Sequence, residues 1–182
     1  MSSFRSKIAA IGIAAGVTGA SITALGLPTV GQDAPNGKVE DADGKALETK
    51  NLKGKPILIV YEDRDSAAQN EKLKKQLGEL AKGDKYKTKI ALAAVADVSS
   101  YDFWPAKGFV KDAIREESKK QGTTIYCDWN ASFRKAFKLT KGKSSVVLVG
   151  KDGKVLFAGE GSLSDSDRKK LVELLKAQVE AS

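Results

Sequence analysis

The sequence of 182 residues contains no histidine and only one cysteine, Cys127. Without histidine, the chain lacks the side chain that most often acts as a general base and as a metal ligand. A single cysteine excludes an intrachain disulfide and a four-cysteine zinc site. Glycine and proline, at 17 and 4 residues, are not in excess, so most of the chain is not low-complexity sequence. With 41% hydrophobic residues, this length suits one globular domain plus a short additional segment.

The formal net charge is +8, and much of it comes from lysines spread along predicted helices. We interpret these lysines as solvated helix faces. Contact with anionic lipid, cell-wall polymer or nucleic acid is the alternative explanation of such a charge. The sequence has no compact arginine-rich run with interleaved aromatic residues, so we expect no specific nucleic-acid partner.

Residues 1–29 are predicted to be a signal peptide or an N-terminal membrane anchor, and residues 30–182 the folded domain. Arg5 and Lys7 precede an uncharged stretch at 8–27 that ends in small residues, a pattern typical of secretory signals. The stretch is long enough to span a bilayer, but its glycines and hydroxyls make it weakly hydrophobic, so we favour cleavage. We therefore predict an exported, periplasmic protein. If the segment is retained, residues 8–27 anchor it to the inner membrane and are its only membrane contact.

Hydrophobic periodicity predicts an α/β fold with a mixed central sheet flanked by helices. Leu73, Leu77 and Leu80, for example, repeat at helical spacing. Early strand–helix–strand units favour parallel pairing, and a terminal hairpin adds antiparallel strands. The predicted order is an N-terminal β-hairpin at 38–40 and 46–48, a strand at 57–61, a helix at 66–82, a strand at 89–98, a helix at 109–121, a strand at 123–127, a short helix at 131–137 capped by Asn130, a hairpin at 145–149 and 154–158, and a last helix at 164–181 opened by Ser164.

Residues 55–70 are the stretch around which the predicted fold is organised. An apolar run rich in branched residues, 57–61, is followed by a polar turn and a helix that Asp65 or Ser66 is placed to cap. Chemistry is often found where a buried strand runs into a helix N-terminus, because free backbone N–H groups and the helix dipole point at that place.

Three segments resemble the redoxin branch of the thioredoxin-like superfamily. Residues 30–35 are similar to the lead-in to its first hairpin, residues 53–61 to its Gly-Lys-apolar strand, and residues 146–155 to its late hairpin. A closer resemblance is to the YtfJ family, small exported thioredoxin-like proteins of Gram-negative bacteria with a poorly defined function. It is carried by Lys-Tyr-Lys-Thr at 85–88, Gly-Phe-Val-Lys at 108–111, Asp128 before the short helix, and Ser144 with Ser145 before the hairpin. The resemblance implies a thioredoxin-like fold over residues 30–181.

The chain departs from the redoxin pattern at the positions that carry its chemistry. Asp65 stands where the branch has its nucleophilic cysteine, Ala68 where a second cysteine would follow, and Ser144 where a cis-proline usually approaches the dithiol. Dithiol exchange needs two thiols, and a peroxidase of this fold needs a thiolate at the helix start. The remaining residues predict a ligand-binding cleft instead. Its candidates are Tyr61, Glu62, Asp63, Arg64, Asp65, Ser66, Ser144 and Ser145.

Two groups within the chain have alternative interpretations. Glu62, Asp63 and Asp65 could hold a hard cation or act as an acid/base pair, but we favour helix capping and dipole compensation and expect no metal and no cofactor. Cys127 ends a predicted strand, and we favour a buried small hydrophobe over a redox thiol.

An aromatic cluster precedes and opens the helix predicted at 109–121. We favour core packing for this cluster, and the helix pattern places Phe109, Val110, Ala113 and Ile114 on its buried side. If the cluster is exposed instead, it is the best partner-binding patch in the chain. Its members are Tyr101, Phe103, Trp104 and Phe109.

The sequence as a whole predicts an exported thioredoxin-like protein without a Cys-x-x-Cys dithiol. We favour a non-enzymatic role as a binding or accessory module of the periplasm, with an unidentified periplasmic protein or small ligand as its partner. The alternative is a thiol-dependent oxidoreductase or peroxidase that acts through Cys127, a class suggested by the fold alone.

Overall fold

The computed structural model describes residues 26–52 and 54–180. The segment that we predict to be a signal peptide or membrane anchor therefore lies almost wholly outside the described residues. Within the described part, no helix is long and apolar enough to cross a membrane.

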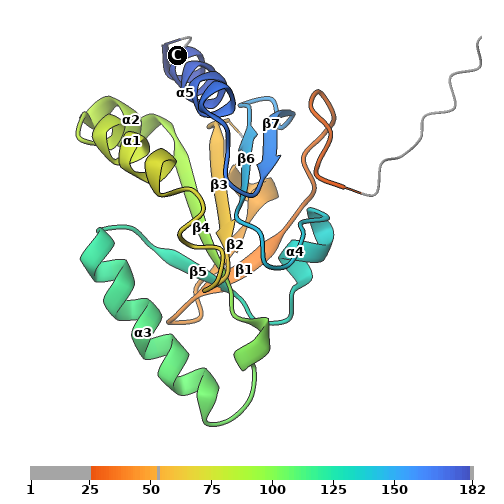
Figure 1. Ribbon diagram of the computed structural model, residues 1–182, viewed down its shortest axis with the longest axis vertical. Coiled ribbons are helices and arrows are strands. Elements are labelled where there is room, and N and C mark those ends of the chain that lie inside the picture. Colours follow the sequence, from red (N-terminus) through yellow and green to blue (C-terminus); the bar gives the residue numbers. More distant parts are fainter. Residues whose placement is uncertain (1–25, 53, 181–182) are drawn as a thin grey trace, which may run out of the picture.

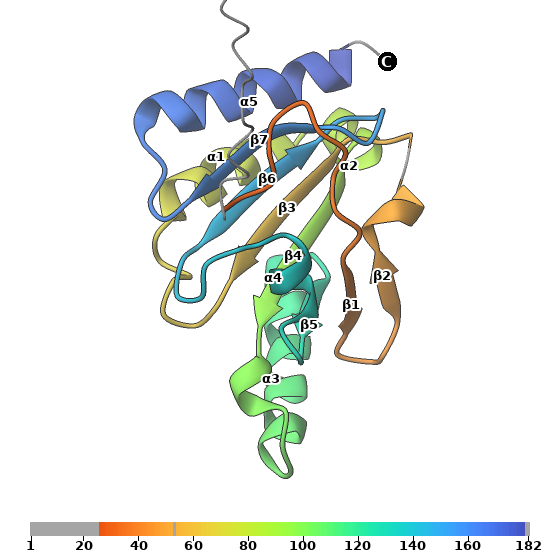
Figure 2. The ribbon, with the colours of Figure 1, turned by 90° about the vertical axis from the view of Figure 1, so that its right-hand side faces the viewer.

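A seven-stranded mixed sheet forms the centre of the fold, in the order β2-β1-β5-β4-β3-β6-β7 (Figures 1 and 2). The β3–β4 and β4–β5 pairs are parallel, and the other neighbours are antiparallel. The mixed sheet with an N-terminal hairpin is confirmed. The strands are β1 Lys38–Asp41, β2 Ala46–Glu48, β3 Ile57–Glu62, β4 Ala91–Asp97, β5 Ile125–Asp128, β6 Ser145–Val149 and β7 Val155–Glu160.

Helices cover both faces of this sheet. They are α1 Glu71–Ala81, α2 Asp84–Lys89, α3 Ala106–Gln121, α4 Ser132–Ala136 and α5 Asp165–Glu180, with short 3-10 helices η1 Thr49–Leu52 and η2 Ser99–Tyr101. Figure 1 shows α1, α2 and α5 on one side of the strands and α4 on the other. Because side chains alternate along a strand, Ile59 and Tyr61 of β3 pack with Phe133 of α4, whereas Leu58 and Val60 pack with the α1 and α5 side.

The first long helix starts five residues later than the sequence predicts. It begins at Glu71, with Asn70 at its N-cap position, so a helix over 66–82 capped by Asp65 or Ser66 is wrong. Residues 64–70 form turns instead, because the Ser66 side chain is held by Asp63 and does not face a helix end. The sequence pattern also gave no sign of α2, which shortens the strand predicted at 89–98 to Ala91–Asp97.

The short helix α4 is present but is capped differently from the prediction. Its N-cap residue is Ala131, and the Asn130 side chain accepts a hydrogen bond from the Ser132 amide. The amides of Phe133 and Arg134 are bound instead by Asp128, the last residue of β5. The cap of α4 is therefore supplied from the sheet, which fixes the helix against the ends of the parallel strands.

Candidate functional site

The three parallel strands β3, β4 and β5 each end in an acidic residue: Glu62, Asp97 and Asp128. Parallel strands end at the same edge of a sheet, and Asp97 is the register partner of Asp128. We call this place the carboxyl edge. Open α/β sheets bind ligands beyond the carboxyl ends of their strands, so this edge is the natural location for a functional site.

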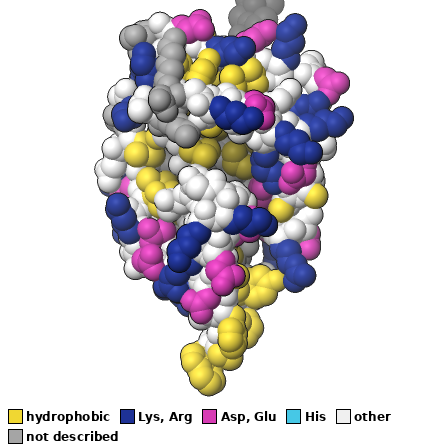
Figure 3. Space-filling view, turned by 90° about the vertical axis from the view of Figure 1, so that its left-hand side faces the viewer, with side chains coloured by type: hydrophobic (Ala, Val, Ile, Leu, Met, Phe, Trp, Pro, Cys, Tyr) yellow, Lys and Arg dark blue, Asp and Glu magenta, His cyan; other side chains and the backbone are white. Residues whose placement is uncertain are grey.

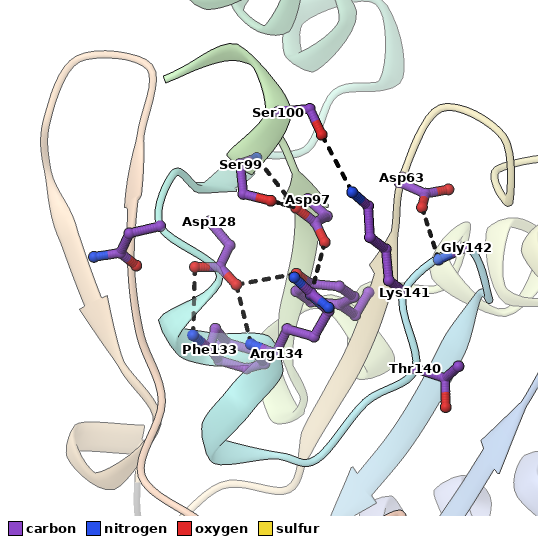
Figure 4. Close-up of polar contacts among 12 residues, drawn as sticks. Asp63, Asp97, Ser99, Ser100, Asp128, Phe133, Arg134, Thr140, Lys141 and Gly142 are labelled. Atoms are coloured by element: carbon purple, nitrogen blue, oxygen red, sulfur yellow. Dashed lines mark hydrogen bonds and ion pairs between the residues drawn. The ribbon is translucent and has the colours of Figure 1, made fainter. Parts of the chain in front are cut away.

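Asp128 is the most deeply buried acid of the carboxyl edge, with 1% of its surface exposed. Its Oδ2 accepts a hydrogen bond from the Tyr61 hydroxyl at 3.0 Å and one from the Arg134 amide at 3.0 Å, and its Oδ1 accepts from the Phe133 amide (Figure 4). Burial, followed by the nearby Asp128 carboxylate, raises the pKa of Tyr61 well above its usual range. Tyr61 therefore acts here as a neutral hydrogen-bond donor.

Asp97 forms an ion pair with Arg134, whose Nε lies 3.0 Å from Asp97 Oδ2. The other carboxyl oxygen of Asp97 accepts hydrogen bonds from the amide and the hydroxyl of Ser99 (Figure 4). Arg134 thus contacts two buried carboxyl groups, because its backbone binds Asp128 while its side chain binds Asp97. A buried charge needs a partner, and here the Asp97 carboxylate is paired with Arg134 through Oδ2 while its Oδ1 accepts the two hydrogen bonds from Ser99.

Glu62 belongs to a second polar network that joins β3, α1 and the start of β6. The Ser144 hydroxyl donates to Glu62 Oε1 at 2.8 Å, and Asn70 Nδ2 donates to the Ser144 hydroxyl at 2.8 Å. Lys74 Nζ lies 3.2 Å from Glu62 Oε2. Burial lowers the pKa of Lys74, but the carboxylates of Glu71 and Glu62 outweigh it, so the net pKa is raised. Ser144, at the position that resembles the cis-proline site, is thus a buried link in this network.

The turn after β3 is closed by Asp63 and Ser66. The Ser66 amide donates to Asp63 Oδ1 at 2.8 Å, and the Asp63 amide donates to the Ser66 hydroxyl at 2.9 Å. The other carboxyl oxygen of Asp63 accepts from the Gly142 amide at 2.9 Å (Figure 4). Partial burial raises the pKa of Asp63, but these hydrogen bonds outweigh burial and lower it overall.

The predicted cleft residues are therefore divided between buried and exposed positions. Tyr61, Ser66, Ser144 and Ser145 are buried and hydrogen-bonded, the last to Glu160. Arg64 and Asp65 are exposed. Among the residues that the structure describes, no three His, Cys, Asp or Glu side chains gather closely enough to hold a metal ion. Their assignment as ligand-binding residues stays a prediction.

Cys127 lies in the middle of the sheet, on β5, with Ala96 and Glu40 as its register partners on either side. Its side chain points to the sheet face opposite that of its neighbour Asp128, because side chains alternate along a strand. A cavity of about 310 Å³ is lined by Cys127 and Trp129 among others, but only 1% of the Cys127 surface is exposed. Burial, and then the charge of Glu40, raises the pKa of the thiol to about 11.

The predicted aromatic patch is exposed, and core packing is wrong for these residues. The exposed fractions are 92% for Trp104, 73% for Phe109, 59% for Phe103 and 37% for Tyr101. We call these four residues the aromatic tip. Figure 3 shows hydrophobic side chains gathered on a projection at one end of the molecule, where η2 leads into α3 in Figure 1.

The helix pattern around the aromatic tip is only partly confirmed. Val110 and Ile114 pack against the cluster of Val98, Cys127 and Trp129, as expected of the buried side of α3. Phe109 and Ala113 are exposed, which contradicts the prediction. The first turns of α3 extend beyond the strands in Figures 1 and 2, so the sheet does not cover that part of the helix.

Sequence reasoning missed the residues that organise the carboxyl edge. It assigned no role to Asp97, Asn70 and Arg134, although the first two are buried, the third is half-buried, and all three make specific contacts. A signal for Asp97 was present, because it is the acidic last residue of an otherwise apolar strand. No local pattern points to Arg134, whose role depends on β4 and α4 meeting in space.

Comparison with known proteins places this chain among bacterial proteins. A family model described as a bacterial protein of unknown function, YtfJ_HI0045, matches residues 36–178. No curated protein sequence matches the chain. A structure described as a putative thiol:disulfide interchange protein DsbE from Chlorobium tepidum is 15% identical, with a TM-score of 0.62, and the match covers 84% of this chain and 99% of that one.

Two further structures show the same fold similarity. An uncharacterised conserved protein from Geobacillus kaustophilus is 16% identical with a TM-score of 0.62, over 84% of this chain and 83% of that chain. A thiol peroxidase from Chromobacterium violaceum is 12% identical with a TM-score of 0.58, over 83% of this chain and 88% of that chain. At such identities the similarity establishes the thioredoxin-like fold and does not establish an activity.

Proposed function

This chain belongs to the YtfJ_HI0045 family of bacterial proteins of unknown function, and from that premise we propose that it is a binding or accessory module without redox activity. The observation that carries the proposal is the location of Cys127. The thiol is buried within the sheet and its pKa is raised to about 11, the reverse of the exposed, low-pKa thiolate on which thiol catalysis depends.

The strand–helix turn supports the same proposal. The positions that resemble the dithiol sites hold Asp65 and Ala68, and the turn itself is tied down by the Asp63–Ser66 hydrogen bonds. On the far side of the turn, Ser144 is bound by Glu62 and Asn70. These contacts stabilise one conformation of the turn and occupy the hydroxyls of Ser66 and Ser144. A partner would have to break them to bind at the turn, so we favour binding through an exposed surface.

Export to the periplasm is the second part of the proposal. It rests on the pattern of residues 1–29, in which Arg5 and Lys7 precede an uncharged stretch. Fractionation of cells that express the full chain with a C-terminal tag tests it. A tagged protein of reduced mass in the periplasmic fraction supports export with cleavage, whereas unprocessed protein in the cytoplasm would overturn it.

Turnover assays test the non-redox role directly. The chain is incubated with hydrogen peroxide and, separately, with insulin disulfides, using dithiothreitol as reductant, beside the Cys127→Ser variant. We expect no turnover above buffer for either protein. The thioether-forming reagent iodoacetamide should label Cys127 slowly at pH 8, because a pKa of about 11 leaves about one thiol in a thousand ionised.

The alternative, an oxidoreductase or peroxidase that acts through Cys127, makes the opposite prediction in the same assays. Turnover by the unmodified chain that disappears in Cys127→Ser would show that the buried thiol becomes accessible and reacts. Rapid labelling of the folded protein, at a rate close to that of the protein in guanidinium chloride, would equally contradict the non-redox proposal.

A further inference from the structure

We propose that the aromatic tip docks this protein on the surface of a bilayer that contains anionic lipid. The inference rests on the proposed binding role and identifies the bilayer as the partner that the aromatic tip binds. If residues 8–27 are retained as an anchor, the tip adds a second membrane contact to theirs.

The exposure of the tip is the first observation. Three large aromatic side chains, Phe103, Trp104 and Phe109, lie within seven residues of sequence and are each more than half exposed. Scattered exposed apolar residues are ordinary, but a contiguous set of this size indicates an interaction surface. None of the three belongs to a hydrophobic cluster of the described core.

The shape of the tip favours a lipid surface over a protein groove. In Figure 3 the hydrophobic side chains form a projection, not a hollow, and Figure 2 shows the same end of α3 extending away from the sheet. Apolar side chains that project from a surface are buried only if the partner can rearrange around them. Lipids at the boundary between headgroups and acyl chains can do so. Tryptophan is enriched at that depth because its ring is amphipathic.

The tip is held in place by the rest of the fold. Lys107 Nζ lies 2.7 Å from Asp102 Oδ1 and 4.6 Å from the centre of the Trp129 ring. Val110 and Ile114 pack beneath α3 against the Trp129 cluster. The tip is therefore presented by a packed helix, and the negative charge of Asp102 beside it is neutralised by Lys107.

Charge gives the reason for an anionic bilayer. The segment 134–143 contains five basic residues and no acidic residue, and Lys135, Lys138, Lys141 and Lys143 are exposed. Within the described part of the chain, none of these four lysines forms an ion pair with a carboxylate. Clusters of lysine beside a membrane surface are attracted by anionic headgroups.

The basic segment and the tip lie at the same edge of the sheet. Segment 134–143 runs from α4 to the start of β6, and η2 follows the end of β4, so both are at the carboxyl edge. Lys141 Nζ approaches the hydroxyl of Ser100, in η2, at 3.5 Å (Figure 4). One docking orientation therefore brings the aromatic rings and Lys141 of the basic segment toward the membrane together.

Brominated-lipid quenching tests the proposal on the full chain. The chain contains two tryptophans, Trp104 in the tip and the buried Trp129. Vesicles of brominated phosphatidylcholine with phosphatidylglycerol are compared with vesicles of brominated phosphatidylcholine alone, and the Trp104→Phe variant gives the signal of Trp129. We expect the phosphatidylglycerol vesicles to quench Trp104 and shift its emission to the blue, and Trp129 to be unaffected.

Two sets of variants separate the contributions of aromatic insertion and charge. Phe103→Ser with Phe109→Ser should weaken vesicle binding and reduce Trp104 quenching at least about tenfold, whereas the exposed apolar control Val30→Ser should leave both unchanged. Replacing Lys135, Lys138 and Lys143 by Gln should weaken binding about tenfold at low salt and less at high salt. The matched lysine control replaces Lys72, Lys75 and Lys176, exposed residues of α1 and α5, by Gln.

The results that overturn the proposal are distinct from those that overturn the non-redox role. Vesicle binding without quenching of Trp104 would show that the aromatic tip does not enter the bilayer and would overturn the proposal. Equal quenching on vesicles without phosphatidylglycerol would refute the anionic preference. A protein partner that binds the unmodified tip while Trp104 stays unquenched by lipid would make the tip a protein-docking surface. None of these outcomes depends on turnover by Cys127.

Discussion

Asn70→Ala is the perturbation that best tests whether the polar network behind the strand–helix turn stabilises the fold. The Asn70 side chain is 2% exposed, and its Nδ2 donates to the Ser144 hydroxyl and to the Gly161 carbonyl, both at 2.8 Å. Its Oδ1 accepts from the Leu163 amide at 3.0 Å. One side chain thus joins the start of β6 to the segment that leads into α5.

The magnitude follows from what truncation leaves behind. The Gly161 carbonyl and the Leu163 amide lose the Asn70 partner that they have in the structure, and an unsatisfied buried polar group costs about 1–3 kcal/mol. We therefore expect Asn70→Ala to lower the free energy of unfolding by about 3 kcal/mol. For a domain of this size that corresponds to a fall in Tm of about 6–12 °C.

Urea unfolding, followed by circular dichroism and by tryptophan fluorescence, measures the effect. Asn130→Ala is the matched control, because it removes the same atoms from an exposed site where the side chain accepts one hydrogen bond, from the Ser132 amide. We expect the control to cost about 1 kcal/mol or less, since water replaces the lost contact. An Asn70→Ala loss no larger than that of Asn130→Ala, with unchanged m-values, would refute the reasoning.

Three further predictions concern the carboxyl edge. Tyr61→Phe should lower the free energy of unfolding by about 1–3 kcal/mol, because the Asp128 carboxyl loses a buried donor. Arg134→Met should cost about 3 kcal/mol, because the Asp97 carboxyl then lacks its buried ion-pair partner, and adding Asp97→Asn should restore part of that stability. Asp63→Asn should destabilise at neutral pH but not in acid: the pKa of Asp63 is lowered from 3.8 on folding, so its contribution is present above about pH 3.8 and is lost as the pH falls through the folded value.

Each of these predictions has a control on the exposed surface and is measured by chemical denaturation, at a series of pH values for the third. Tyr101→Phe, Arg64→Met and Asp65→Asn make the same chemical changes at exposed positions. A stability loss in Tyr61→Phe or Arg134→Met that is no greater than in its control would contradict the assigned contacts. A difference between Asp63→Asn and the unmodified chain that persists unchanged at low pH would contradict the assigned sign of the pKa shift.

The location of the aromatic tip shows why local pattern alone misassigned Phe109. Periodicity puts Phe109 on the same helix face as Val110 and Ile114, and those two residues do pack inward. The pattern contains no information about where the sheet ends, and the first turns of α3 run past it (Figure 1). An apolar position is buried only if another element lies opposite it, which sequence periodicity does not specify.

The strand–helix turn also shows what local sequence predicts and what depends on contacts with the rest of the fold. The polar residues after β3 predict a turn, and a turn is present. The helix start at Ser66 was wrong because the Ser66 hydroxyl and the Asp63 carboxyl close the turn on each other's backbone amides, and Asp63 is also held by Gly142 from the distant loop before β6. Serine and aspartate side chains serve equally well as helix caps and as turn closures, so the local sequence does not distinguish the two. The contact from Gly142 is between residues distant in sequence, and no local pattern predicts it.

What the sequence alone determined is the strands, most of the helices and the classes of chemistry that are excluded. Branched apolar runs specify the strands, an Asp-Gly turn specifies the first hairpin, and Ser164 opens α5 by accepting a hydrogen bond from the Asp167 amide, because these are effects of neighbouring residues. The lack of histidine and of a second cysteine excludes whole classes of site by composition alone, since a missing side chain cannot be supplied by folding.

Only the tertiary structure decided which side chains meet. Asp97, Asp128 and Arg134 converge because two parallel strands end together and α4 folds back over them. The burial of Cys127 and the exposure of Trp104 depend likewise on what lies opposite each residue in space. Contacts between segments distant in sequence, and the desolvation that they impose, are properties of the packed chain as a whole, so no local pattern of residues encodes them.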